Sequence, residues 1–377
     1  MKVLYISHSA LLYGAPKSLL ELVKGMNEKG IEPVVVMPSK GDLQIELDKS
    51  KIANVIVPYD SCIYHGEYHA SDYARYIWVN MQAVRRIRKI IKKEKIQLVH
   101  TNTLAVDVGA VAAYLSKIPH VWHFREYLKE DFAYKRLNTR MIRKLVQNSK
   151  CCIAISEGIK RKYQKEYGIN PVKLYDGIEC SLYEHSVNME EDVNETPRLL
   201  LAGAICDGKG QWDAVRAVEI LAGKGVAVHL NIVGNGDAKF IKALKKYVKE
   251  KRLTKYIVFR PFMRQLQKMR VQSCIVLVCS RMEAFGRVTA EAMLAGKIVI
   301  GTNAGGTLEL IGKDEERGYL YQYGHSEELA GKIEYVLQNR QEVIEKERKA
   351  QLFIKKLTDM DAYTDRIAQI YKEATVK

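Results

Sequence analysis

The sequence contains no apolar run as long as 18 residues, so it offers no candidate for a transmembrane helix. Its N-terminus, MKVLYISH, turns polar too early for a secretory signal peptide. None of the seven cysteines lies in a C-x-x-C pair, which argues against a zinc site, and their odd number argues against a disulfide framework. We therefore expect a cytoplasmic protein, either free or peripheral on the inner face of the plasma membrane, whose reduced cysteines lie mostly in the core.

Acidic residues are scarce relative to basic ones: 44 Asp and Glu stand against 60 Lys and Arg, which gives a formal net charge of +16. Such a charge calls for an anionic partner, which could be nucleic acid, an anionic lipid surface or an anionic substrate. A nucleic-acid-binding protein is the least favoured class, because the basic residues lie on amphipathic helices without interleaved aromatic residues and no recognition motif appears. We expect no nucleic-acid partner.

Alternating strand and helix patterns predict an α/β fold, and 377 residues suit two domains, each with a doubly wound sheet. In the first half the expected strands are 2–7, 33–38, 54–58, 96–103, 120–126, 151–156 and 172–178. In the second half they are 198–205, 226–234, 256–262, 273–279 and 298–302. An acidic, apolar-poor stretch at 181–197 predicts the linker, with domains at 1–185 and 198–360.

The most informative stretch is 280–296, SRMEAFGRVTAEAMLAG, where a buried strand gives way to a loop and then to a helix. A helix N-terminus has free N–H groups and a positive dipole end, so it favours a phosphate. Glu283 and Glu291 flank this position, and carboxylates would repel the phosphate itself but could accept hydrogen bonds from sugar and ribose hydroxyls. The alternative is that Glu283 only favours the helix N-terminus and Glu291 is a solvated helix residue.

Three further positions are candidates for ligand binding. A loop at 8–16 with Gly14 precedes an expected helix at 17–27, but it lacks the G-x-G-x-x-G fingerprint of dinucleotide-binding enzymes, which counts against a Rossmann dehydrogenase. His123 ends a strand, at the edge where open α/β sheets bind ligands, although a structural histidine is the alternative. Lys209 lies in a loop before a helix at 211–222 and is either a ligand-binding cation or a solvated lysine.

A strongly basic helix is expected at 81–95, with an apolar face of Val84, Ile87, Ile90 and Ile91. Its seven basic residues make either a solvated face or a surface that binds anionic lipid headgroups. The next basic helix would extend that surface with Arg136, Arg140, Arg143 and Lys144.

The pattern Glu283-x-Phe285-Gly286-x-x-x-x-Glu291 resembles the signature of the retaining family 4 glycosyltransferases, which have the GT-B fold. The other resembling segments follow in the family's order along the chain: the Gly14 loop, the His123 strand end, the turn at 176–179, Lys209-Gly210 and Gly305-Gly306. Two positions depart from the family pattern: Ala15 replaces a second glycine, and Ala204 stands where the family has an arginine. The candidates to replace that arginine are Arg264, Arg281 and Arg287.

The resemblance implies two Rossmann-like domains facing across a cleft, with the acceptor bound by 1–185, the donor by 198–360, and a C-terminal helix at 361–377 that returns to the first domain. It implies transfer, with retention, of a sugar from a nucleoside diphosphate sugar, most simply a UDP-sugar, to a glycan or lipid-linked acceptor in bacterial-type cell-surface polysaccharide or glycoconjugate synthesis. No cofactor and no metal are expected, since no Asp-x-Asp stands at a strand end. A nucleotide-sugar epimerase of the same fold is the alternative.

The resemblance also assigns roles to individual residues. The implied catalytic residues are His123, Glu283 and Lys209. The implied donor-binding residues are Gly14, Ala15, Gly234, Asn235, Phe262, Phe285, Gly286, Arg287, Val288 and Glu291.

Overall fold

The computed structural model describes residues 1–132, 134–183, 196–263 and 266–376. The chain divides into two compact units: unit 1 comprises Met1–Glu179 and Thr358–Lys377, and unit 2 comprises Cys180–Leu357. The linker expected at 181–197 falls largely outside the described residues. The chain returns to unit 1 at Thr358, slightly before the helix start expected at 361.

Unit 1 is built on a parallel seven-stranded sheet with the order β3-β2-β1-β5-β6-β8-β9. Its strands are β1 (Lys2–Ile6), β2 (Glu32–Met37), β3 (Ala53–Ile56), β5 (Leu98–Thr101), β6 (His120–Phe124), β8 (Cys151–Ala154) and β9 (Val172–Lys173). A small antiparallel pair joins β4 (Ile63–Tyr64) to β7 (Lys135–Arg136). The helices are α1 (Gly14–Glu28), α2 (Asp42–Lys49), α3 (Ala70–Lys93), α4 (Val108–Ser116), α5 (Lys129–Phe132), α6 (Thr139–Asn148), α7 (Glu157–Tyr167) and α15 (Met360–Thr375).

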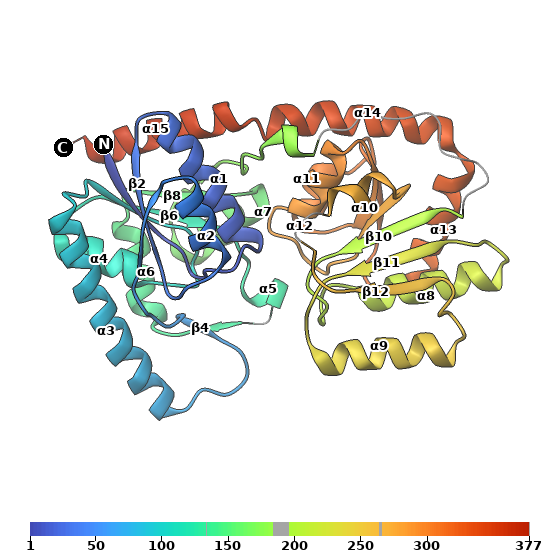
Figure 1. Ribbon diagram of the computed structural model, residues 1–377, viewed down its shortest axis with the longest axis horizontal. Helices are drawn as coiled ribbons and strands as arrows, with labels where there is room; N and C mark the ends of the chain where they lie inside the picture. The colour runs from blue at the N-terminus through green and yellow to red at the C-terminus, as the bar shows by residue number, and fades with distance from the viewer. Residues whose placement is uncertain (133, 184–195, 264–265, 377) are drawn as a thin grey trace. The chain divides into compact units, whose positions relative to one another are not determined.

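The central strands of unit 1 are buried on both faces, as their unbroken apolar sequences predict. Because side chains alternate along a strand, Val3 and Tyr5 of β1 enter one core, with α1, α2 and α15, while Leu4 and Ile6 enter the other, with α3 and α4. Figure 1 shows α15, in red, beside α1, in blue, so the end of the chain packs against its beginning.

Unit 2 holds a parallel six-stranded sheet with the order β12-β11-β10-β13-β14-β15. The strands are β10 (Arg198–Ala202), β11 (His229–Val233), β12 (Ile257–Arg260), β13 (Ile275–Val278), β14 (Ile298–Thr302) and β15 (Tyr319–Tyr321). The helices are α8 (Gln211–Gly223), α9 (Ala238–Glu250), α10 (Gln267–Val271), α11 (Arg287–Leu294), α12 (Gly305–Ile311), α13 (Ser326–Gln338) and α14 (Arg340–Leu357), and a short 3-10 turn, Cys180–Leu182, opens the unit. Residues of α8, α9 and α13 form its main core with the sheet.

The predicted α/β class with two doubly wound parallel sheets is confirmed. Several local predictions were wrong. The helix expected at 17–27 starts at Gly14, so Gly14 and Ala15 form its first turn instead of a loop. The helix expected at 81–95 begins at Ala70. Arg136 belongs to β7 and is half-buried, not part of a basic helix face.

All seven cysteines are free thiols, but only Cys62, Cys152 and Cys279 are buried, so the expectation that most lie in the core was wrong. Within the described ranges, none of the helices combines the length and the apolar character needed to span a bilayer.

Candidate functional site

The sheet of unit 2 reverses its winding between β10 and β13. The chain runs outward from β10 to β12, then returns to the centre and runs outward from β13 to β15. In open α/β sheets, ligands bind beyond the carboxyl ends of the two strands at such a switch point. Lys209 follows β10 and Glu283 follows β13, so the fold places both candidate catalytic residues of this unit where a ligand is expected.

Lys209 and Glu283 are in direct contact. The Lys209 ammonium donates a hydrogen bond to Oε1 of Glu283 at 2.7 Å, and the two side chains are only 17% and 20% exposed. Burial opposes ionisation of the Glu283 carboxyl, but the charge and hydrogen bond of Lys209 outweigh it and hold the pKa of Glu283 below its ordinary value. The pair therefore consists of a carboxylate and an ammonium at neutral pH.

Backbone contacts between the two loops fix this pair. The backbone N–H of Arg281 donates to the carbonyl of Gly208 at 2.7 Å. Gly210 has φ +67°, and a Cβ at this position would lie 2.0 Å from the carbonyl oxygen of Cys279. Only glycine lets the chain approach β13 this closely, so the Lys209-Gly210 sequence serves the geometry as well as the charge.

The N-terminus of α11 lies just beyond Glu283. Its N-cap, Gly286, adopts φ +84°, and the helix begins at Arg287, followed by Val288. The α12 turn packs against this loop, because the N–H of Gly306 donates to the carbonyl of Glu283 at 2.7 Å. A Cβ on Gly306 would meet the carbonyl oxygen of Phe285 at 2.2 Å, so the Gly305-Gly306 pair is required by close backbone contact.

Glu291, in α11, is buried in a polar cluster. Its Oε1 accepts from Arg287 at 3.0 Å and from the Tyr183 hydroxyl at 3.1 Å, and its Oε2 accepts from Arg270 at 2.7 Å. The residue is 8% exposed, so the alternative of a solvated helix residue was wrong. Two guanidinium groups and a phenol instead hold an ionised carboxylate at a fixed position.

The remaining donor-binding candidates of unit 2 lie together at the ends of β11 and β12. The Asn235 side-chain oxygen accepts from the backbone N–H of Phe262 at 3.1 Å, and the Phe262 ring is 39% exposed. Gly234 allows a close crossing, since a Cβ there would lie 1.8 Å from the carbonyl of Gly203. The cluster offers an exposed aromatic face beside backbone polar groups.

The structure narrows the search for a cation that replaces the arginine missing at Ala204. Arg287 is engaged with Glu291, and Arg264 lies outside the described residues. Arg281 is 51% exposed, and its guanidinium lies 3.5 Å from the Asp207 carboxylate, in the loop that carries Lys209. Of the two candidates that the structure describes, Arg281 is the one whose charge lies beside the Lys209 loop.

The sheet of unit 1 has its own switch point, between β1 and β5. Asn102 follows β5 and links the predicted residues around it: its amide N–H donates to the carbonyl of Ala15 at 2.9 Å, and its oxygen accepts from Arg125 at 2.9 Å. Arg125 in turn donates to Nδ1 of His123 at 3.2 Å. The first turn of α1 and the end of β6 are thus parts of one polar cluster, and Asn102, on the polar strand end HTNT, is a residue that sequence reasoning could have found.

His123 is fully buried at the end of β6. Burial and the nearby positive charge of Arg125 hold the pKa of His123 well below its usual range, so the imidazole is neutral. Its Nε2 has no hydrogen-bond partner within the described part of the chain. The same two causes lower the pKa of His8, just after β1, to about 4. Two neutral imidazoles therefore accompany a buried arginine at this strand end.

Arg125 is neutralised by Asp176, whose two carboxylate oxygens both accept from its guanidinium, and Arg125 also contacts the Tyr363 hydroxyl of α15 at 3.4 Å. The turn at 176–179 therefore carries the countercharge of the strand-end arginine. A Cβ on Gly177 would lie 2.7 Å from the Tyr363 ring, which explains the glycine in that turn.

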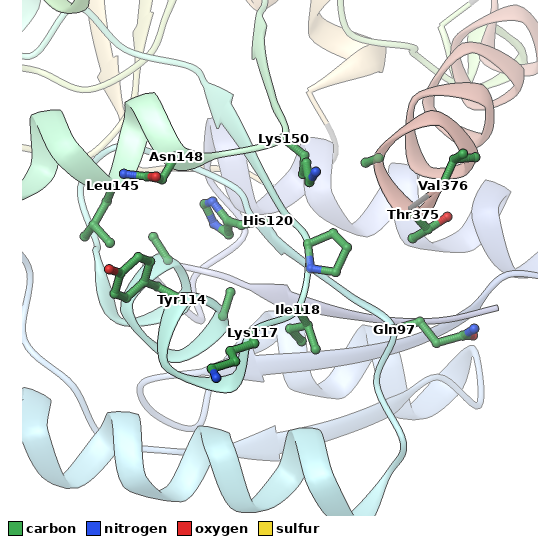
Figure 2. Close-up of a pocket in the computed structure, with 14 residues that line it drawn as sticks. Gln97, Tyr114, Lys117, Ile118, His120, Leu145, Asn148, Lys150, Thr375 and Val376 are labelled. Atoms are coloured by element: carbon green, nitrogen blue, oxygen red, sulfur yellow. The ribbon is translucent and has the colours of Figure 1, made fainter.

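A cavity of about 650 Å³ lies at the opposite edge of the same sheet (Figure 2). Gln97, Pro119 and Lys150, which directly precede β5, β6 and β8, line it together with Thr375 of α15. Burial lowers the pKa of His120, also in this lining, to about 3. Because this edge carries the amino ends of the strands, the cavity is separate from the candidate site.

The comparisons with known proteins all point to glycosyltransferases. The family model for glycosyl transferases group 1 matches residues 188–352, and the model for glycosyltransferase family 4 matches residues 13–180. An uncharacterised glycosyltransferase of Methanocaldococcus jannaschii is 25% identical over 295 residues, which cover 75% of this chain and 77% of that protein.

Solved structures share the fold. The Anabaena protein HepE, crystallised with UDP-glucose, superposes with a TM-score of 0.83 at 22% identity, over 99% of each chain. A glycosyltransferase from Rickettsia africae superposes with a TM-score of 0.80 at 21% identity, over 99% of this chain and 98% of that one. At these identities the likeness concerns the fold.

Proposed function

Since the chain belongs to the group 1, family 4 glycosyltransferases and has their GT-B fold, we propose that it transfers a sugar from a UDP-sugar to a glycan or lipid-linked acceptor, with retention at the anomeric carbon. The process it serves is, in this proposal, bacterial-type cell-surface polysaccharide or glycoconjugate synthesis. Unit 2 would bind the donor and unit 1 the acceptor.

The observation that carries the proposal is the Lys209–Glu283 pair at the switch point of unit 2. A donor diphosphate at the N-terminus of α11 would be neutralised by Lys209 and by the free N–H groups after Gly286. Glu283 would then accept hydrogen bonds from sugar hydroxyls, each worth about 1.5–3 kcal/mol because the acceptor is charged. Glu291, held by Arg270 and Arg287, would accept from the ribose.

A uridine nucleotide is favoured because HepE was crystallised with UDP and with UDP-glucose. The base would lie at the Asn235–Phe262 cluster, where an aromatic face and backbone groups are exposed together. Arg281 would supply the second cation that the family arginine provides, because its charge lies beside the Lys209 loop.

The proposed reaction needs no metal ion and no cofactor. The bond between the anomeric carbon and the β-phosphate oxygen breaks, and the acceptor oxygen bonds to the same face of that carbon. The leaving phosphate takes the acceptor's hydroxyl proton, so charge and atoms balance. Lys209, Arg281 and the α11 N-terminus would stabilise the departing diphosphate in place of a metal ion. His123, a neutral imidazole, would contact the donor sugar.

The basic helix α3 supports an anionic membrane surface as a partner. Six exposed basic residues lie on it from Arg85 to Lys93, and a seventh, Lys95, is exposed just beyond its end. Trp78 is 66% exposed and Met81 49% exposed, and at helical spacing they lie on the same face as Arg85, Arg88 and Lys92. Aromatic and apolar side chains beside basic ones suit a lipid interface, which would bring unit 1 to a lipid-linked acceptor.

The test combines binding with product analysis. A panel of nucleotide sugars is screened by thermal stabilisation, and the best donor is incubated with and without a lipid-linked acceptor. We expect a UDP-sugar to stabilise the protein, slow release of UDP without acceptor, and faster release with it. Conversion of the donor to an epimeric UDP-sugar would favour the epimerase, and the absence of any nucleotide-sugar binding would refute the proposal.

A further inference from the structure

Unit 1 contains a second cavity, of about 920 Å³, formed by the segment after β6 together with α6 and α7. Basic and aromatic side chains dominate its lining. The basic residues are Lys129, Arg136, Arg140, Arg143, Lys162 and Lys165, the aromatic ones are Tyr127, Tyr134, Tyr163 and Tyr167, and the acidic ones are Glu130 and Glu166. The excess of positive charge indicates an anionic ligand.

Arg136 is a cation of this cavity with two buried guanidinium nitrogens. Pairing of β7 with β4 fixes its backbone, since Arg136 lies opposite Ile63. One guanidinium nitrogen, Nη1, donates to the Tyr167 hydroxyl. The other two, Nε and Nη2, are buried without a hydrogen-bond partner among the described residues. Buried, unpaired N–H groups on a charged side chain are costly unless a ligand accepts from them.

Glu166, in the lining, is near enough for its charge to act on Arg136, but no ion pair joins the two within the described residues. Burial raises the pKa of the Tyr167 phenol above its usual range, so its hydroxyl stays protonated and leaves Arg136 cationic. Glu130 instead pairs with Lys162. Arg143 lies over the Tyr167 ring at 5.9 Å, and no ion pair holds its guanidinium or that of Arg140 within the described ranges. Three arginines are thus available to one ligand.

The cavity adjoins the strand end of unit 1. Tyr127, in its lining, follows His123 by four residues, so their Cα atoms are at most about 14 Å apart. The Tyr163 hydroxyl donates to the carbonyl of Glu126 at 2.7 Å, which ties α7 to that strand end. A ligand about the length of one sugar plus a phosphate could reach from the cavity to His123.

We propose that this cavity binds the phosphate or pyrophosphate group of the acceptor, with Arg136, Arg140 and Arg143 as its ligands and Tyr167 as its floor. The inference rests on the proposed function, because it needs unit 1 to bind an acceptor. Arginine forms paired, charge-assisted hydrogen bonds with phosphate, and an aromatic ring beneath the guanidinium limits its motion. The acceptor is therefore a phosphate-bearing molecule, not a neutral glycan.

The test uses inorganic pyrophosphate as the probe. It is titrated by calorimetry into the full-length protein saturated with UDP, so that the donor site is occupied. Arg140→Gln and Arg143→Gln each remove one exposed cation and should each weaken pyrophosphate binding about tenfold. Lys144→Gln is the matched control, because Lys144 is exposed in the same helix, next to Arg143, but does not line the cavity. Its affinity should stay within about twofold of wild type.

The proposal is overturned if the UDP-saturated wild type does not bind pyrophosphate. An equal loss in the Lys144 control also overturns it, because it would show a general charge effect. Sedimentation with phosphatidylglycerol vesicles separates the two sources of phosphate. Loss of vesicle binding in Arg140→Gln and Arg143→Gln with pyrophosphate binding intact would assign these arginines to the membrane and refute the site. UDP-sugar binding, measured on the same samples, reports independently on the proposed function.

Discussion

Replacing Glu283 with glutamine separates turnover from nucleotide binding. Glutamine keeps the size and one hydrogen-bonding oxygen but removes the charge that faces Lys209 at 2.7 Å. If Glu283 holds the donor sugar, the substitution weakens a charge-assisted hydrogen bond worth about 1.5–3 kcal/mol, which corresponds to roughly a 10- to 150-fold loss in kcat/KM.

The nucleotide should respond differently. At 2.7 Å the pair attracts by about 6 kcal/mol at an effective dielectric constant of 20, although desolvation of the two charges offsets much of this. In Glu283→Gln the Lys209 ammonium loses the carboxylate that competes with the diphosphate for its charge. The Kd for UDP should therefore stay within about threefold of wild type or fall.

The assays are initial rates with the correct donor and acceptor, and calorimetric titration of UDP. The pH dependence of stability is a further readout. Because the pKa of Glu283 is lower in the folded protein than its usual 4.5, the pair's contribution to stability is present above pH 4.5 and is lost as the pH falls through the folded-state pKa. The difference in melting temperature between wild type and variant should shrink accordingly. Equal and small effects on rate and UDP affinity in a folded variant would refute the reasoning.

Four other predictions concern Glu291, Arg281, metal dependence and membrane binding. Glu291→Ala should weaken UDP binding about tenfold and, by removing the ion-pair partner of the buried Arg270, lower the free energy of unfolding by about 3–5 kcal/mol; an unchanged UDP titration and melting curve would contradict this. Arg281→Gln should lower kcat/KM for the donor about tenfold without changing the melting temperature, whereas an unchanged rate would exclude Arg281 as the second cation. Activity with the correct donor and acceptor should survive excess EDTA, and complete loss restored by manganese or magnesium would overturn the metal-free mechanism. The protein should sediment with anionic but not neutral liposomes, reversibly with salt, and a variant of α3 should lose this binding but keep donor hydrolysis; a wild type that ignores anionic liposomes at low salt would remove the membrane from the proposal. That variant carries glutamine at Arg85, Arg86, Lys92 and Lys93.

The sequence was most informative where local chemistry and backbone geometry coincide. Gly286, Gly210 and the Gly305-Gly306 pair lie at positive φ or at contacts that exclude a Cβ, so short motifs marked both switch-point loops of unit 2. Strand ends were also predictable, because apolar β-branched runs stop abruptly at polar residues. This is why Lys209 and Glu283 could be singled out before their contact was known.

Partners brought in from distant segments could not be predicted. Arg270 lies in the short helix α10 and Tyr183 in the turn that opens unit 2, and neither belongs to a motif, yet both bind Glu291. Their contacts depend on how the chain folds back over 21 and 108 residues, respectively, which no local pattern encodes. The start of α1, expected at 17, was misplaced for a different reason. Pro16 is the third residue of the helix, a position compatible with proline because the first-turn N–H groups need no partner.

The polar strand end of unit 1 depends on the last helix of the chain as much as on the first half of the sequence. Arg125 is buried, and a buried guanidinium is tolerated only if its donors are paired. Asp176 and Asn102 supply most of that pairing, and Tyr363 of α15 closes the remaining side. Another tyrosine of the same helix, Tyr371, shares a hydrogen bond of 2.7 Å with Nδ1 of His100, whose ring centroid lies 5.4 Å from that of His123. Helix α15 therefore fixes the charge and orientation of the groups around His123. Substitutions on its inward face should alter the chemistry of that strand end as well as the stability of unit 1.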